Sequence, residues 1–160
     1  MVEYSNFKCP ACQEVQPTLA HLLSRYPGKI RYEFRHFPVA NDRRSVMAHL
    51  AAEAAGAQGR FWPYHHRLFQ DRARWMNAPD PLGIFLQLAV ESGLDENRFS
   101  KSFFDPEILK RVEQDLNAGR ALGVRATPTF FIQGHVLVGP RQFEQEAEKW
   151  IKEALQPSTA

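Results

Sequence analysis

The most informative stretch of this chain is residues 2–12, which reads Val2-Glu3-Tyr4-Ser5-Asn6-Phe7-Lys8-Cys9-Pro10-Ala11-Cys12. Its first six residues combine β-branched and aromatic side chains with little alternation, which predicts the end of a buried strand. A proline at the first position of a helix is a start signal, so Pro10 makes Cys9 the residue that caps a helix. Apolar residues then follow with helical spacing, and Pro17 among them predicts a kink. The stretch is therefore a strand that leads directly into a helix beginning at a Cys-x-x-Cys motif.

The spacing of the two cysteines favours thiol–disulfide chemistry. A thiolate attacks disulfides, whereas a thiol does not. At a helix N-terminus, free backbone N–H groups and the helix dipole stabilise the thiolate of Cys9 and lower its pKa. Cys12 lies one turn inside, on the same face, where it can attack a mixed disulfide formed at Cys9. The motif predicts a redox centre whose only reactive group is the Cys9–Cys12 pair, with no further cofactor.

The cysteine count weighs against the other uses of this residue. Two cysteines cannot staple a chain of 160 residues, so a disulfide framework is excluded. One Cys-x-x-Cys supplies two ligands, whereas structural zinc needs four, and the six histidines are scattered. We therefore expect no metal. Two ordinary core cysteines remain an alternative, although core cysteines do not usually begin a helix.

Composition limits the class of protein. The chain is 44% hydrophobic, which is enough for a packed core, and its length fits one domain or one domain with a large insertion. The formal charge is +2 without a block of basic residues, so we expect no nucleic-acid partner. No apolar run approaches the roughly 20 residues that span a bilayer. Residues 1–7 are too short and too polar for a signal peptide.

The order of the remaining elements predicts an α/β fold. Residues 30–37 alternate as a second strand, residues 129–138 form a hairpin around Gln133-Gly134-His135, and residues 141–155 form an amphipathic final helix. Residues 42–123 are nearly all helical, which is too long for a simple crossover. We therefore expect a core of residues 1–41 and 124–156, with an inserted helical subdomain of residues 42–123.

Several helices of the insertion have start signals. Asp42, Asp80 and Asp95 are predicted caps, and Pro106 opens a long helix that ends at Gly123. Within the insertion, Phe61 and Trp62 are interpreted as core residues. His65 and His66 are expected to face solvent or to cap the inserted helices.

The motif and three further segments resemble the DsbA-like family of thioredoxin-fold thiol–disulfide oxidoreductases. Residues 2–12 resemble its active-site entry, and Arg35-His36-Phe37-Pro38 resembles the end of its second core strand. Residues 59–69 resemble part of its helical insertion, and residues 123–134 resemble its cis-proline loop and hairpin. Pro17 matches the kinking proline common across thioredoxins. The resemblance covers essentially the whole chain and implies a thioredoxin-like fold with an inserted helical subdomain.

The resemblance also implies roles for individual residues. Pro128 would follow a cis peptide bond after Thr127, and this loop would align the substrate backbone beside Cys9, together with Pro10 and Ala11. The alternative for Pro128 is an ordinary proline that starts a strand. Glu3 would be a buried acid that exchanges a proton with Cys12; the alternative is an exposed carboxylate at a strand end.

Two departures from the family pattern accompany these roles. Ala126 stands where the family often has glycine. Met1 falls inside the expected central strand, where family members usually have several further residues before this point.

The function implied is oxidation of thiols in exported proteins. The partners would be thiol-containing protein substrates and a membrane redox partner that re-oxidises the pair. The protein would be located in the periplasm or cell envelope. A disulfide isomerase usually needs two redox modules held together, and no dimerisation segment is visible, so a monomer is expected. A reductase or isomerase on the same fold and a non-catalytic thioredoxin-like binding module remain alternatives. The absence of a signal peptide leaves the cytoplasm open.

Overall fold

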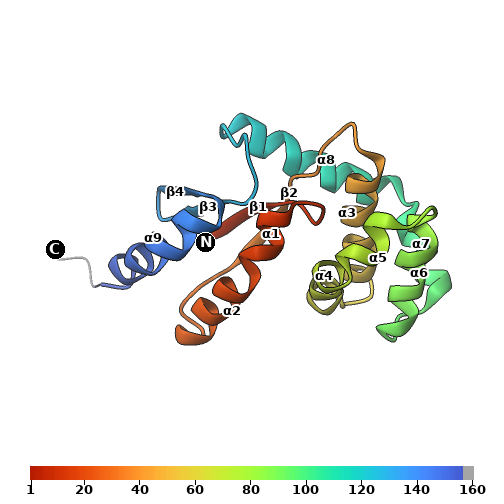
Figure 1. Ribbon diagram of the computed structural model, residues 1–160, viewed down its shortest axis with the longest axis horizontal. Coiled ribbons are helices and arrows are strands. Elements are labelled where there is room, and N and C mark those ends of the chain that lie inside the picture. The colour runs from red at the N-terminus through yellow and green to blue at the C-terminus, as the bar shows by residue number, and fades with distance from the viewer. Residues whose placement is uncertain (157–160) are drawn as a thin grey trace.

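A four-stranded mixed sheet forms the centre of one half of the molecule in the computed structural model, which describes residues 1–156. The strands are β1 (Val2–Ser5), β2 (Glu33–His36), β3 (Thr129–Ile132) and β4 (His135–Val138), in the order β2-β1-β3-β4. Strand β1 pairs parallel with β2 and antiparallel with β3. The first and last parts of the chain thus share one sheet (Figure 1).

Two strand boundaries differ from the sequence-based prediction. Pairing of β2 begins where Glu33 lies opposite Val2, so residues 30–32 precede the strand. In the hairpin, β3 and β4 pair directly from Ile132 and His135, which leaves a two-residue turn. Its residues Gln133 and Gly134 have φ values of 47° and 86°, the positive values that a tight hairpin turn requires.

Helices from both ends of the chain pack on the sheet. These are α1 (Pro10–Glu14), α2 (Gln16–Arg25) and α9 (Gly139–Ala154). The break between α1 and α2 falls at Val15, because Pro17 has no N–H to continue the hydrogen-bond ladder. One hydrophobic cluster joins these helices to β3 and β4, and it includes Val15, Leu19, Phe130, Phe143 and Ile151.

Six helices make up the middle of the chain. They are α3 (Arg43–Gly56), α4 (Phe61–Gln70), α5 (Arg72–Asn77), α6 (Pro81–Glu91), α7 (Glu96–Phe103) and α8 (Pro106–Ala121). The side chains of Asp42, Asp80 and Asp95 each accept a backbone N–H at a helix start, which confirms the predicted caps. Asp105, which is not among the predicted caps, caps α8 in the same way. Helices α3–α7 gather at one end of the molecule, and α8 leads back to the sheet (Figure 1). Within residues 1–156, no helix combines the length and the apolar character needed to cross a membrane.

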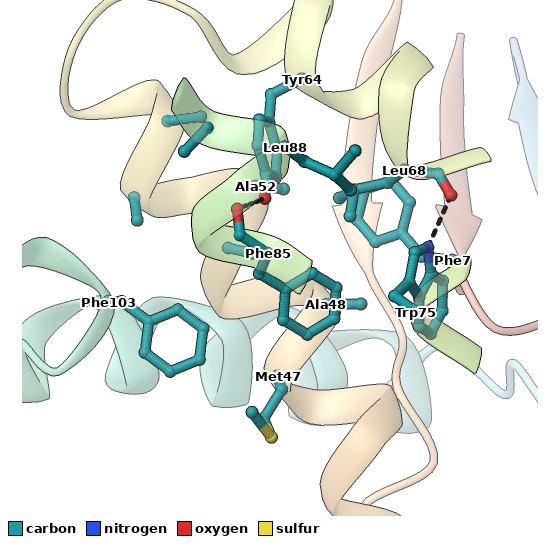
Figure 2. Close-up of a cluster of buried hydrophobic side chains, with 14 of the residues drawn as sticks. Phe7, Met47, Ala48, Ala52, Tyr64, Leu68, Trp75, Phe85, Leu88 and Phe103 are labelled. Carbon is teal, nitrogen blue, oxygen red and sulfur yellow. Dashed lines mark hydrogen bonds between the residues drawn. The ribbon is translucent and has the colours of Figure 1, made fainter. Parts of the chain in front are cut away.

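A second hydrophobic cluster fills the helical end of the molecule. Trp75 and Tyr64 are fully buried there, and their polar atoms donate to the backbone oxygens of Leu68 and Phe85 (Figure 2). Phe7, which comes from the loop before the cysteines, lies in the same cluster and is also fully buried. The loop that carries the cysteines is thus anchored in the core of the inserted helices.

Helix α8 approaches the sheet closely at Gly119. A Cβ atom at this position would lie 2.8 Å from ring atoms of both Tyr4 and Phe37. Any larger residue would push α8 away from β1 and from the end of β2. This glycine therefore sets the distance between α8 and the loops beside the cysteines.

Candidate active site at the start of helix α1

Cys9 occupies the N-cap position of α1, as the sequence predicts. Its φ and ψ of −74° and 123° are extended, while its carbonyl already accepts the first helical bond from the N–H of Gln13 at 3.2 Å. The Cys9 Sγ lies 3.4 Å from the carbonyl oxygen of Thr127. The peptide bond between Thr127 and Pro128 is cis. Residues 118 positions apart in the chain therefore meet at one site.

The two cysteines have opposite environments. Both are free thiols; Cys9 is half-buried and Cys12 is fully buried. A hydrogen bond from the Cys12 side chain, helped by Thr127 and by the backbone N–H groups of Ala11 and Cys12, lowers the pKa of Cys9 to about 5, although burial opposes this. Burial, followed by the interaction with Cys9, raises the pKa of Cys12 far above its ordinary value. At neutral pH, Cys9 is the thiolate and Cys12 keeps its proton.

A buried acid lies beneath the cysteine pair. Glu3 is fully buried in β1, and burial raises its pKa to about 7, the largest of several effects. The hydroxyl of Tyr32 donates to Glu3 Oε2 at 2.5 Å, which opposes that rise. Among the described residues, Glu3 Oε1 has no hydrogen-bond partner. A carboxyl group that titrates near neutral pH can give or take a proton there.

The inserted helices hold the loop between β1 and α1, residues 6–9, which we call the redox loop. The Oδ1 atom of the buried Asn6 accepts from the Lys8 N–H at 3.0 Å and from the Ser45 hydroxyl at 3.0 Å. The backbone N–H of Asn6 points at Cys12 Sγ at 3.4 Å. From α5, Arg72 Nε donates to the Lys8 carbonyl at 2.9 Å. Sequence reasoning missed Asn6 and Arg72, because only the fold brings their partners to this loop.

The charge of Lys8 is paired. Its ammonium group contacts the carboxylate of Asp42, the residue that caps α3. A free ammonium group next to Cys9 would stabilise the Cys9 thiolate. The ion pair largely cancels that effect, so the helix start and the Cys12 thiol remain the sources of the low pKa of Cys9.

A groove of about 800 Å³ runs between α2 and α4 beside Tyr32, and we call it the side groove. Trp62 lies over it with 41% of its surface exposed, and its ring packs at a tilt against Tyr32 with the ring centroids 5.4 Å apart, so its interpretation as a core residue was wrong. The expectation for His65 was also wrong: only 1% of it is exposed, because rings such as those of Phe7 and Phe69 surround it. His66 does face solvent. Burial lowers the pKa of His65 to about 3, which keeps it neutral.

Comparison with known proteins places this geometry in a family. The model for the family described as thioredoxin matches residues 1–153. The chain belongs to the thioredoxin family. Its fold is similar to those of several solved structures. A thioredoxin-like oxidoreductase from Silicibacter pomeroyi has a TM-score of 0.82 at 23% identity, over 98% of this chain and 86% of that one. The thiol-disulfide exchange protein alpha-DsbA2 from Wolbachia pipientis has a TM-score of 0.81 at 23% identity, over 96% and 80% of the two chains. The predicted thioredoxin-like α/β fold with inserted helices is confirmed.

The curated relatives of this thioredoxin-family chain are much longer proteins. The Na(+)/H(+) antiporter NhaA 3 of Salinispora tropica is 37% identical over 147 residues, which is 90% of this chain and 21% of the antiporter. The chain spans about a fifth of the length of the curated relatives it matches.

The structure brings the expected site residues of this thioredoxin-family chain together. Cys9 and Thr127 form the mouth of the site, with Pro10 exposed and Ala11 half-buried on the first turn of α1, and Pro128 is buried behind Thr127. Cys12 and Glu3 lie below them in the interior. The catalytic and substrate-binding roles of these residues remain predictions.

Proposed function

We propose that this chain is a thiol–disulfide oxidoreductase that oxidises thiols of exported proteins through Cys9 and Cys12. A substrate thiolate attacks Cys9 Sγ of the disulfide form, and Cys12 leaves with the electron pair of the broken S–S bond. Glu3 supplies a proton to the Cys12 thiolate. A second substrate thiol then attacks the substrate sulfur of the mixed disulfide and releases Cys9 as a thiolate. Two substrate thiols are thereby oxidised, and the Cys9–Cys12 disulfide is reduced.

The asymmetry of the two cysteines carries this proposal. Cys9 is accessible and has a pKa of about 5, whereas Cys12 is buried and protonated. A stable Cys9 thiolate favours the reduced form of the pair, and a pair whose reduced form is stabilised is an oxidant. Thiolate also leaves better when its pKa is low, which speeds release of the oxidised substrate. The scheme uses no cofactor beyond the cysteine pair.

The reduction potential of the Cys9–Cys12 pair tests the direction of electron flow. We expect a value between that of the strong oxidant DsbA, about −120 mV, and that of thioredoxin, about −270 mV. A peptide-thiol oxidation assay and an insulin-reduction assay should run in parallel, with oxidation the faster. A potential at or below that of thioredoxin would instead favour a reductase. Absence of exchange in both assays would favour a non-catalytic binding module.

The compartment and partners follow from the direction of electron flow. An oxidant of this kind works where disulfides persist, so we place it in the periplasm or cell envelope, acting as a monomer on thiol-containing proteins. A membrane redox partner would re-oxidise the cysteine pair after each turnover. Trapping that partner with the Cys12→Ser variant in intact cells tests this assignment.

A second candidate function rests on the curated relatives. Since the chain matches about a fifth of proteins named as Na(+)/H(+) antiporters, it would serve as a redox module of a longer membrane protein or of a membrane partner. The same trapping experiment separates the two functions. Mixed disulfides with many soluble exported proteins support the oxidase, and one dominant adduct with a membrane transporter supports the module.

A further inference from the structure

A cleft opens beside the reactive cysteine, on the side of the cis-proline loop. It lies between residues 37–41, which follow β2, and residues 125–127, which precede Pro128; the end of α8 closes it. Its volume is about 320 Å³. Thr127 belongs both to this cleft and to the contact with Cys9 Sγ, so the cleft lies next to the residue that touches the reacting sulfur. A polypeptide whose cysteine reaches Cys9 must place neighbouring residues in or beside this space.

Two arginines line this space, which we call the arginine cleft. Arg120 ends α8 and Arg125 lies in the following loop, and both are exposed. Arg125 Nη1 donates to the carbonyls of Arg120 and Val124 at the end of α8, which fixes its position without neutralising its charge. Within residues 1–156, neither guanidinium forms an ion pair with a carboxylate.

Two acidic residues that are close in sequence to the lining segments are engaged elsewhere. Asp42 follows the loop of residues 37–41 but pairs with Lys8 and caps α3. Asp115, one turn before Arg120, accepts from Arg35 and from the backbone N–H of His36. None of the residues that line the arginine cleft is acidic. The cleft therefore carries two unpaired positive charges beside the apolar surface of Phe37 and of Val39, which is 55% exposed.

We propose that the arginine cleft selects protein substrates that carry acidic side chains next to the reacting cysteine. This inference rests on the proposed function and adds the substrate class. A substrate carboxylate would lie between Arg120 and Arg125, and an apolar neighbour would contact Val39. Exposed charges act mainly on encounter and orientation, so the preference should appear in the second-order rate constant and weaken with salt.

Three dithiol peptides test the proposal. They have the same sequence except at the two residues that flank the first cysteine, which are both Glu in one peptide, both Gln in the second and both Lys in the third. The rate of reduction of the Cys9–Cys12 disulfide is followed by acid quench and thiol alkylation. At low ionic strength, we expect the Glu peptide to react about ten-fold faster than the Lys peptide, since each exposed ion pair adds a modest amount. High salt should shrink this ratio.

Charge variants assign the preference to the cleft. Replacing both arginines, Arg120→Gln with Arg125→Gln, should bring the Glu-to-Lys ratio close to one, and replacing both with Glu should invert it. The matched control, Arg60→Gln with Arg98→Gln, removes two exposed arginines, one at the N-cap of α4 and one in α7, and should keep the preference.

The outcomes separate this inference from the function on which it rests. Equal rates for the three peptides, or a preference that survives both cleft variants, would overturn the proposal while leaving the oxidoreductase intact. A preference lost equally in the Arg60 and Arg98 control would show that only net charge matters, and would also overturn it. Absence of exchange with every peptide would overturn the proposed function itself, and the inference with it.

Discussion

The candidate site has a mouth, where Cys9 contacts Thr127, and a buried floor, formed by Cys12 and Glu3, and the two differ although Cys9 and Cys12 are neighbours in sequence. At the mouth, Cys9 meets backbone N–H groups and the Cys12 thiol, and its pKa falls to about 5. At the floor, Cys12 and Glu3 are fully buried, and burial raises the pKa of each. Cys9 caps α1 and Cys12 lies in the first turn of the same helix, so a difference in burial across one helical turn accompanies the opposite chemistry of the two thiols.

The two regions also respond oppositely to pH. The Cys9 thiol has a lower pKa in the folded protein than in the unfolded chain, so the reduced form gains stability as the pH rises from about 5 to about 9. The Glu3 carboxyl has a higher pKa in the folded protein, so its protonated form stabilises the fold at low pH, and this stability is lost as the pH rises from about 4.5 to about 7. Only the pH dependence that comes from Cys9 disappears when the cysteine pair is oxidised, because Cys9 then has no thiol to titrate.

The largest effect should come from replacing either cysteine with serine. Cys12→Ser should accumulate mixed disulfides through Cys9, because the resolving thiol is missing. Cys9→Ser should lose exchange on the order of a thousand-fold or more, as when a nucleophile is removed, because Cys12 is buried and protonated. Non-reducing gels and mass spectrometry with a peptide that contains a disulfide measure both, because the Cys9 thiolate attacks one sulfur of that disulfide and releases the other as a thiolate. Trapping by Cys9→Ser instead would reverse the assignment of mouth and floor.

The second effect should come from Glu3→Gln, which removes the charge at the floor. The step in which Cys12 gains or loses a proton should slow by about ten-fold, while attack at Cys9 stays nearly unchanged. Relative to wild type, the variant should gain about 3 kcal/mol of unfolding free energy between pH 4 and pH 8, because a fully buried carboxyl no longer has to ionise.

Rapid-quench kinetics and urea titrations at the two pH values check the Glu3→Gln prediction. Glu144→Gln, an exposed position on α9, is the matched control and should change neither quantity. Unchanged breakdown of the mixed disulfide in Glu3→Gln would remove Glu3 from the mechanism.

The sequence predicts the parts of the site that depend on local chemistry. The cap at Cys9, the helix start at Pro10 and the aspartate caps of the inserted helices follow from a few adjacent residues, and the structure confirms them. The burial of Glu3 and the cis bond before Pro128 were implied only by the family resemblance, because neither has a local signal.

The remaining parts depend on tertiary packing. Tyr32 precedes its strand and reaches Glu3 only because β1 and β2 lie side by side. His65 looks like a surface histidine in sequence, and it is buried because the aromatic ring of Phe7 crosses from the redox loop into the inserted helices. No periodicity within a single element reports such contacts between distant segments.

The third effect tests the mouth through Ala11→His. A histidine between the cysteines adds a donor and a positive charge beside the Cys9 thiolate, which the wild-type chain lacks because Lys8 is paired with Asp42. We expect the reduction potential to rise by about 30 mV, which is a ten-fold change in the equilibrium constant of the two-electron couple. Equilibration with glutathione buffers measures it, and Ala57→His, at the exposed end of α3, is the control. An unchanged potential would mean that the helix start already saturates thiolate stabilisation, and a fall would contradict the prediction.

The smallest effect should come from Tyr32→Phe, which changes the floor without touching either cysteine. The lost hydroxyl donates to Glu3 Oε2 and favours the carboxylate, so its removal should raise the pH at which Glu3 titrates by about one unit. Breakdown of the mixed disulfide should slow about three-fold at neutral pH, and its pH profile should move upward by the same unit. Tyr26→Phe removes a hydroxyl that donates to Glu148 on the surface and should leave the profile in place. Because a merely structural role for Tyr32 would lower stability without moving the profile, an unmoved profile in Tyr32→Phe would confine the floor of the site to Glu3 and Cys12.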